Sequence, residues 1–206
     1  MANITITQGA STADIAQWIA TSLNAALAQS EGEIAITLPG GSTPFPILAE
    51  LAKLGLPFER IVVWPGDDRI VPEDHAASNT GRIRAELEPL GAKIVALEEG
   101  ITPPHFALAW LGMGNDGHIA SLFPNTDPQP DAPAKVLRLT PDPLPPEAPF
   151  DRLSMTIPSL VNADALLFVA RGEEKQAILE AGAKGEHDLP VARLLKAAQA
   201  PVTCFT

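Results

Sequence analysis

Residues 34–53 read IAITLPGGSTPFPILAELAK, and this stretch decides the fold. Ile34–Leu38 is a short apolar run, which is typical of a strand buried on both faces. Gly40 and Gly41 allow a tight turn, and a helical pattern follows over Phe45–Lys53, with Pro44 suited to its first turn. A buried strand, a turn and a helix in this order begin a strand–helix–strand unit, which predicts a parallel sheet.

Apolar runs and helical patterns continue to alternate on both sides of this stretch. Further strands are predicted at Asn3–Thr7, Ile61–Trp64, Ile94–Ala96, Phe106–Leu111 and Ala165–Ala170. Further helices are predicted from Ser11 or Thr12 to about Ala28, from Ser78 or Asn79 to about Leu87, and for about ten residues from Glu173. The sequence therefore predicts an α/β fold, a doubly wound, mostly parallel sheet with helices on both faces, in a single domain of residues 1–206.

One segment departs from this pattern. Nine of the 21 prolines fall between Phe123 and Phe150, which disfavours a long helix there. We expect an excursion at about residues 123–150 with a short strand at Val136–Thr140. Because the alternation resumes afterwards, no domain boundary is predicted.

The composition excludes several classes of function. The chain has 206 residues, of which 46% are hydrophobic, and a formal net charge of −11. Nucleic-acid binding needs an excess of Lys and Arg on one face, so we expect no nucleic-acid partner. We also expect no secretory signal and no membrane segment. Cys204 is the single cysteine, which excludes an internal disulfide and a cysteine-based zinc site and fits a cytoplasmic protein.

Four loops follow predicted strands, at Gly40–Thr43, Gly66–His75, Gly112–His118 and Arg171–Lys175. Ligands of doubly wound sheets bind at the carboxyl ends of the strands, so these loops are expected to converge on one crevice. The sequence of each loop suggests a chemical role.

The first loop, Gly40-Gly41-Ser42-Thr43, resembles a phosphate cradle. Its glycines and the following helix start offer backbone amides, and Ser42 and Thr43 add hydroxyl donors. An ordinary strand-to-helix turn with Thr43 as the helix cap explains the same residues.

The second loop carries Asp67-Asp68-Arg69. These residues could form a buried ion pair or direct the Arg69 guanidinium at a phosphate or carboxylate. Since exposed charge is the commoner case, the block by itself predicts a solvated charged loop with a helix cap.

The third loop combines three glycines with Asp116 and His118, which we expect at the start of a short helix. A carboxylate two residues before an imidazole can orient it as a general base. The alternative is an Asp-Gly turn with an incidental histidine. In the fourth loop Lys175 is placed to reach an anion from the first turn of a helix, although such a lysine is more often simply exposed.

Two motifs that indicate other catalytic chemistries, a serine nucleophile elbow and a metal-binding histidine pair, are absent from the sequence. There is no Gly-x-Ser-x-Gly and no His-Glu-x-x-His, and the four histidines are widely spaced. We therefore predict neither a metal nor a cofactor.

Taken together and in this order, the four blocks resemble the glucosamine-6-phosphate isomerase/6-phosphogluconolactonase family. The resemblance runs from Leu38 to about Ala181, and Gly112–Pro124 is its longest block. Arg69, where the isomerases carry Tyr, and Ser121-Leu122-Phe123-Pro124 favour the lactonase branch. The chain departs from the family pattern at Asp68, where Glu is usual, and at Asn115, where Pro is common, and the stretch Glu98–Pro104 and the C-terminus are short.

The resemblance implies hydrolysis of a sugar phosphate lactone, 6-phospho-D-glucono-1,5-lactone, in the oxidative pentose phosphate pathway. It implies that His118 is the general base, oriented by Asp116, and that Gly40–Thr43 and Lys175 hold the phosphate. Asp67, Arg69 and Arg152 are the further binding residues that it implies. Two alternatives stay open: an amino-sugar-phosphate isomerase/deaminase with Asp67 as the base, and a sugar-phosphate sensor without catalysis.

Overall fold

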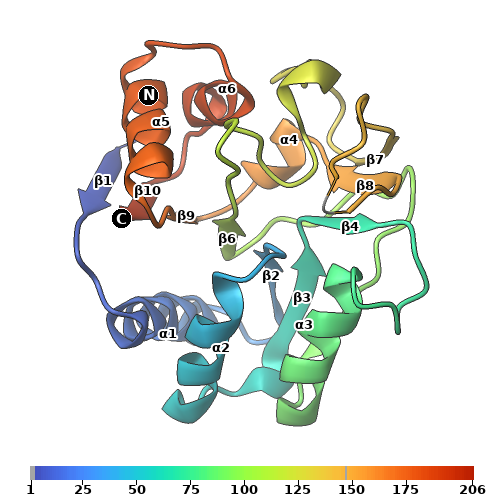
Figure 1. The fold of residues 1–206 in the computed structure, drawn as a ribbon. Coiled ribbons are helices and arrows are strands. Elements are labelled where there is room, and N and C mark those ends of the chain that lie inside the picture. Colours follow the sequence, from blue (N-terminus) through green and yellow to red (C-terminus); the bar gives the residue numbers. More distant parts are fainter. Residues whose placement is uncertain (1–2, 147) are drawn as a thin grey trace.

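A computed structural model describes residues 3–146 and 148–206 of the chain (Figure 1). A seven-stranded sheet, in the order β1-β10-β9-β6-β2-β3-β5, forms the centre, and every neighbouring pair in it is parallel. Its strands are β1 (Ile4–Thr7), β2 (Ile34–Leu38), β3 (Ile61–Pro65), β5 (Lys93–Ile94), β6 (Leu108–Leu111), β9 (Leu166–Val169) and β10 (Val202–Phe205). The predicted doubly wound parallel sheet is confirmed.

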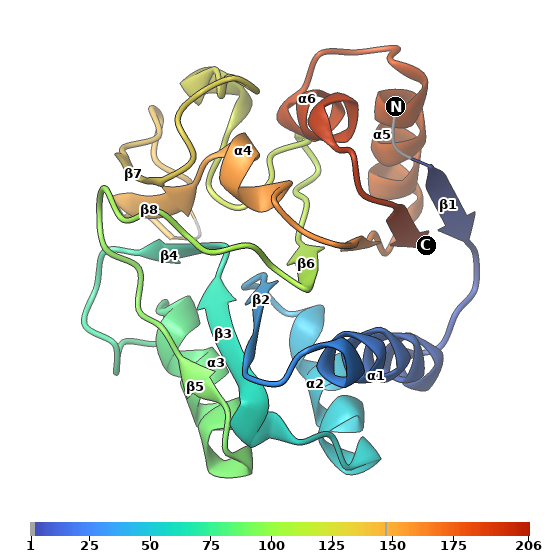
Figure 2. The same ribbon diagram turned by 180° about the vertical axis from the view of Figure 1, so that it is seen from behind.

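Helices cover both faces of this sheet (Figures 1 and 2). On one face lie α1 (Thr12–Gln29), α2 (Pro44–Leu51) and α3 (Asn79–Leu87), and on the other lie α4 (Ile157–Leu160), α5 (Glu173–Lys184) and α6 (Pro190–Ala197). Short 3-10 helices occur at Ala52–Leu54, Phe58–Arg60, Glu88–Leu90 and Pro124–Thr126.

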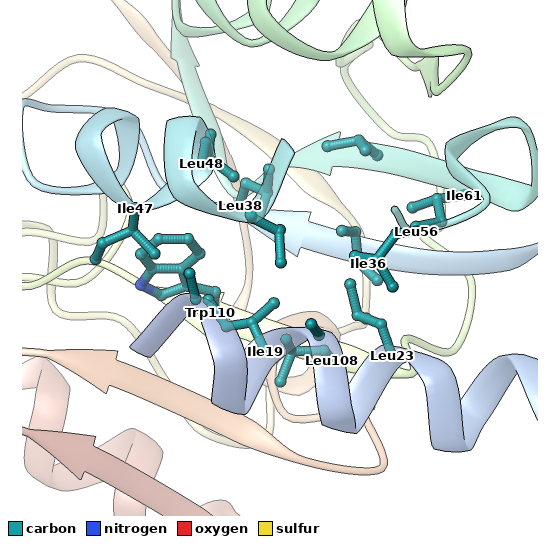
Figure 3. Packing of buried hydrophobic residues seen from close by; sticks show 14 of the residues in the cluster. Ile19, Leu23, Ile36, Leu38, Ile47, Leu48, Leu56, Ile61, Leu108 and Trp110 are labelled. Carbon is teal, nitrogen blue, oxygen red and sulfur yellow. The ribbon is translucent and has the colours of Figure 1, made fainter. Parts of the chain in front are cut away.

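The two faces carry separate hydrophobic cores because successive side chains of a strand point to opposite sides. In β6, Leu108 and Trp110 pack with α1 and α2, whereas Ala109 and Leu111 belong to the core beneath α5 and α6. Figure 3 shows the first of these cores, with Trp110 between Ile19 and Ile47. A strand buried on both sides in this way explains the unbroken apolar runs in the sequence.

The longest helix, α1, shows why the local sequence predicts its element well. Ser11 caps the helix, its side chain accepting from the Asp14 amide while the Asp14 carboxylate accepts from the Ser11 amide. Every fourth residue after this cap is a buried Ile or Leu, namely Ile15, Ile19, Leu23 and Leu27. No helix in the described part of the chain is both long and apolar enough to cross a membrane.

The strand order reverses between β2 and β6. From β2 the chain adds β3 and β5 on one side, and it then returns to add β6, β9 and β10 on the other. At such a switch point the loops after the two strands part and leave a crevice. Here the loops begin at Pro39 and Gly112, and a Cβ on Gly112 would lie 3.0 Å from Pro39 Cβ.

A second, three-stranded antiparallel sheet flanks this crevice, in the order β4-β8-β7. It consists of β4 (Asp67–Arg69), β7 (Val136–Leu139) and β8 (Arg152–Met155). The predicted short strand of the Pro-rich segment is β7. The prediction of a loop throughout Gly66–His75 is wrong, because β4 pairs with β8, which lies far along the chain.

Other differences from the predicted elements are local. No helix begins at Asp116 or His118, where the chain forms turns and isolated bridges instead. The strand expected at Ile94–Ala96 is the two-residue β5, shifted towards the N-terminus. Sequence patterns missed α4, α6 and β10. The four-residue α4 and β10 are too short to show a clear period, whereas α6 buries Val191, Leu194 and Leu195 at helical spacing and was overlooked.

His105 lies at the amino end of β6, the opposite end of the strand from Gly112. Its Nδ1 lies 2.9 Å from Asn162 Oδ1 and its Nε2 lies 2.8 Å from Asp164 Oδ1. The hydrogen bonds with Asn162 and Asp164 raise the pKa of His105 above its ordinary value of 6.5, and burial opposes them. Because both side-chain oxygens accept, both ring nitrogens donate, as they do only in the charged imidazolium.

This charged ring stabilises the fold below about pH 6.5, and the stabilisation is lost as the pH rises through the raised pKa of the folded protein. We expect His105→Ala to lower the free energy of unfolding by about 0.2–1 kcal/mol near pH 5.5, as for other exposed pairs, and by less near pH 9. Urea denaturation at the two pH values measures the difference. An equal loss at both would show that charge plays no part.

Candidate active site

A cavity of about 340 Å³ opens at the carboxyl ends of β2, β6 and β9. All the predicted binding residues and His118 line it: Gly40, Gly41, Ser42, Thr43, Asp67, Arg69, His118, Arg152 and Lys175. Asp116 lies behind His118 and reaches the cavity through it. The structure therefore brings together four loops and β8, as the strand–helix alternation predicts for the four loops.

The Gly40–Thr43 loop presents free donors to this cavity. Among the described residues, no protein acceptor is bonded to the backbone amides of positions 40–43. Gly41 takes a positive φ of 87°. Thr43 is the N-cap residue of α2, as the alternative predicts, but its side chain makes no cap bond and remains available to the cavity. Unpaired backbone amides beside a cavity are available to bind an anion.

Gly40 also lets this loop approach α3. A Cβ on Gly40 would collide with the side chain of Asn79, the first residue of α3. Pro44 and Pro46 carry no N–H, so donors at this junction come mainly from the loop itself rather than from the first turn of α2.

His118 and Asp116 form a hydrogen-bonded pair at the end of the third loop. His118 Nδ1 lies 2.6 Å from Asp116 Oδ1, and the same oxygen accepts from the His118 amide at 3.1 Å. A carboxylate only accepts, so Nδ1 carries the proton and the lone pair of the neutral ring is on Nε2. Partial burial works against the ionised carboxylate, but the hydrogen bond and charge of His118 lower the pKa of Asp116 below its ordinary value.

The surroundings hold the imidazole in place. Its ring packs against Phe123 with the ring centroids 4.5 Å apart, and a Cβ on Gly114 would collide with the ring. Gly117 and Ala120 both take positive φ values, 77° and 51°. These sharp turns prevent the helix that the sequence predicts, and they bring His118 and Ser121 to the same cavity.

Asp67 and Asp68 are buried, with only 8% and 7% of their surfaces exposed, so the predicted solvated loop is wrong. Asp67 accepts from the Ser121 hydroxyl at 2.5 Å and lines the cavity. Burial raises the pKa of Asp67 above its ordinary value, against the hydrogen bond from Ser121 and the positive charges of Arg69 and Arg152. A carboxyl group in this environment takes up a proton more readily than a free aspartate.

Asp68 has a structural place instead. Its carboxylate accepts from the amides of Asn79 and Thr80, at 2.6 and 2.9 Å, and from the Ser78 hydroxyl at 3.2 Å. These contacts fix β4 against the N-terminus of α3, where a negative charge is favoured. The shorter Asp thus serves at a position where the family usually carries Glu.

Arg69 and Arg152 are register partners across β4 and β8, and both line the cavity. Each donates one bond to a backbone carbonyl, Arg69 to Ala77 at 2.8 Å and Arg152 to Ala148 at 2.6 Å. The Nε of each is buried and has no partner among the described residues. Burial and the neighbouring charge of Arg69 lower the pKa of Arg152, against Asp67 and Asp68. Two adjacent guanidinium groups with unused donors favour an anion in this cavity.

Lys175 completes the positive rim from the first turn of α5. Beside it, Asn115 Nδ2 donates to Glu174 Oε2 at 2.9 Å and ties the third loop to α5. A proline at position 115, as is common in the family, would lack this bond.

Sequence reasoning missed two polar residues of the site. Ser121 was visible only as part of a motif, and Asn79 only as a possible cap, whereas Ser78 caps α3. The Asn79 side chain instead donates to the backbone oxygen of Asp67 at 2.9 Å and packs against Gly40. Within the described ranges, no group of three or more His, Cys, Asp or Glu side chains is arranged to hold a metal ion.

Comparison with known proteins agrees with this geometry. A family model described as glucosamine-6-phosphate isomerases/6-phosphogluconolactonase matches residues 7–101 and 85–203. A 6-phosphogluconolactonase from Helicobacter pylori is 30% identical over 194 residues, which cover 84% of this chain and 83% of that protein. One from Pseudomonas putida is 34% identical over 207 residues, which cover 89% and 84%.

Solved structures show the same fold. A 6-phosphogluconolactonase from Thermotoga maritima gives a TM-score of 0.82 at 24% identity, over 100% of this chain and 99% of that one. The enzyme of that name from Trypanosoma brucei gives 0.77 at 22% identity, over 99% and 95%. With the family model and these relatives matching most of the sequence, the chain belongs to the glucosamine-6-phosphate isomerase/6-phosphogluconolactonase family.

Proposed function

We propose that this chain hydrolyses 6-phospho-D-glucono-1,5-lactone to 6-phosphogluconate, the lactonase step of the oxidative pentose phosphate pathway. One observation carries the proposal: the His118–Asp116 pair borders the same cavity as the free amides of the Gly40–Thr43 loop. The first is a general base and the second an anion site, and the substrate carries both a reactive ester and a phosphate. The curated relatives described above are named 6-phosphogluconolactonase.

The chemistry begins at His118. Nε2 of the neutral ring takes a proton from a water molecule as the water oxygen attacks the lactone carbonyl carbon. The Asp116 carboxylate stabilises the imidazolium that forms. The tetrahedral intermediate then expels the ring oxygen, which takes the proton held on His118 Nε2 and so regenerates the neutral imidazole, and the carboxylic acid product ionises. An ester needs no cofactor for this step, since a base and positive charge near the developing oxyanion suffice.

The other groups of the cavity bind the substrate. The amides and hydroxyls of Gly40–Thr43, with the Lys175 ammonium, hold the phosphate, and Arg69 and Arg152 add positive charge around the ligand. Asp67 lies near both guanidinium groups, and their positive charges act against the burial that raises its pKa. We also propose that the protein is cytoplasmic, because the charged phosphate confines such a substrate to the compartment where it is made.

A second function uses the same cavity. Asp67, buried and with its pKa raised, is placed to act as the base of an amino-sugar-phosphate isomerase/deaminase. Arg69 and the Ser121-Leu122-Phe123-Pro124 ending favour the lactonase, because the isomerases carry other residues there.

The function is tested by lactone hydrolysis measured above the spontaneous rate, after prolonged dialysis against a chelator. We expect full activity, because we propose that no metal takes part. Activity that is lost on dialysis and restored by a divalent ion would contradict metal independence. Release of ammonia from glucosamine 6-phosphate, without lactone hydrolysis, would establish the isomerase/deaminase instead.

Replacing His118 with Ala should lower kcat by about 10²–10⁴-fold, the usual range for loss of a general base, and should change KM little. In the wild type, kcat/KM should fall as the pH drops through the range in which histidines gain a proton, about pH 5–8. Asp116 stays ionised over that range because its pKa is lowered.

His105→Ala is the matched control. Because His105 lies outside the cavity, this variant should keep the kinetics of the wild type. A His118→Ala variant that retains more than about a tenth of wild-type kcat, with its acid limb intact, would exclude His118 as the base.

Lys175→Ala removes a charge-assisted contact, which is worth about 1.5–3 kcal/mol, so KM should rise by roughly 10- to 150-fold. Inhibition by 6-phosphogluconate should weaken in parallel, while kcat changes less. Lys184→Ala removes the same charge from the other end of α5 and should leave both constants unchanged. Unaltered KM and product affinity in Lys175→Ala would show that the lysine is an ordinary surface residue.

A further inference from the structure

Arg82, on the exposed side of α3, contacts the Gly40–Thr43 loop from outside the cavity. Its Nη1 donates to the carbonyl oxygen of Gly41 at 3.2 Å. Its guanidinium carbon lies 3.8 Å from the centroid of the Phe45 ring, in the first turn of α2. The Arg82 side chain therefore contacts both the loop and the helix that follows it.

The bond to Gly41 has a consequence on the other side of the loop. In a trans peptide group the C=O and the N–H point in opposite directions. With the Gly41 oxygen held towards Arg82, the Ser42 amide hydrogen points away from Arg82, towards the side where Ser42 lines the cavity. That amide has no acceptor among the described residues. The positive φ of Gly41 permits this orientation.

The same bond strengthens the donor. A charged group bonded to a peptide oxygen polarises the peptide, and its N–H becomes a better hydrogen-bond donor. Stacking on Phe45 restricts the guanidinium, because a planar cation favours the face of an aromatic ring. The charge also lies close to the loop in a chain whose net charge is −11.

We propose that Arg82 is a positioning residue for the phosphate of the substrate, which fixes and polarises the Gly41–Ser42 peptide so that the Ser42 amide binds a phosphate oxygen. The inference rests on the proposed function for the identity of the ligand. Arg82 itself does not line the cavity and touches no reacting atom. Its effect therefore belongs to binding rather than to the chemical step.

The test compares Arg82→Ala and Arg82→Lys with Arg84→Ala. Arg84 is two residues away on the same helix and pairs with Glu73 and Glu88 instead of the loop. Arg84→Ala therefore removes one positive charge from α3, as Arg82→Ala does, but leaves the contact with Gly41 in place. We measure kcat and KM for the lactone, and calorimetric binding of 6-phosphogluconate, which gives a readout independent of turnover.

Arg82→Ala should raise KM and the product Kd together by about 3- to 10-fold, as expected for one positioned hydrogen bond, with kcat nearly unchanged. Arg82→Lys should restore little, because an ammonium cannot stack flat on Phe45 while reaching Gly41. Arg84→Ala should bind as the wild type does. If the wild type bound 6-phosphogluconate but hydrolysed no lactone, the proposed function would fail, and weaker binding by Arg82→Ala would still support the inference.

Three results would overturn it. In the first, Arg82→Ala binds and turns over as the wild type does. In the second, Arg84→Ala weakens binding equally, so that net charge alone matters. In the third, Arg82→Lys restores full affinity, so that the stacked guanidinium is not needed.

Discussion

At the carboxyl ends of β2 and β6 the chain leaves the sheet in opposite directions, and Gly112 packs directly against Pro39. A crevice opens at this point because no crossover covers it. The loop after β2 supplies free amides, the loop after β6 supplies His118, and the strands on either side bring β4 and α5 to the rim. The relative positions of the proposed anion site and the proposed base therefore follow from the order of buried strands, which are packed between two hydrophobic cores.

The site carries a cluster of positive side chains, whereas the chain as a whole is negatively charged. Although the net charge is −11, Arg69, Arg152 and Lys175 all face the cavity. Partly buried guanidinium groups with unpaired donors are costly, and the buried carboxylates of Asp67 and Asp68 offset only part of this cost. Under the proposed function, a dianion bound in this cavity would add a favourable partner for the positive charge and so stabilise the folded state.

The sequence predicts the features that depend on neighbouring residues and misses those that depend on residues far away in the chain. The bounds of β2 and the cap and buried face of α1 follow from neighbouring residues, and so do the four loops at the strand ends. The strand nature of Asp67–Arg69 depends on β8, and nothing near Asp67 indicates that partner. The burial of Asp67 and its hydrogen bond from Ser121 could not be predicted from the sequence for the same reason. The helix expected at Asp116 is excluded by the turns at Gly117 and Ala120, whose φ values only the assembled loop fixes.

We propose that one cavity holds the phosphate on the Gly40–Thr43 amides while presenting the lactone carbon to His118. A crystal structure with bound 6-phosphogluconate is the sharpest test of this arrangement. We expect phosphate oxygens within about 3 Å of the Gly41 and Ser42 nitrogens, and the C1 carboxylate beside His118 Nε2. A ligand bound in the reverse direction, with its phosphate on His118 and its carboxylate on the loop, would rule this arrangement out.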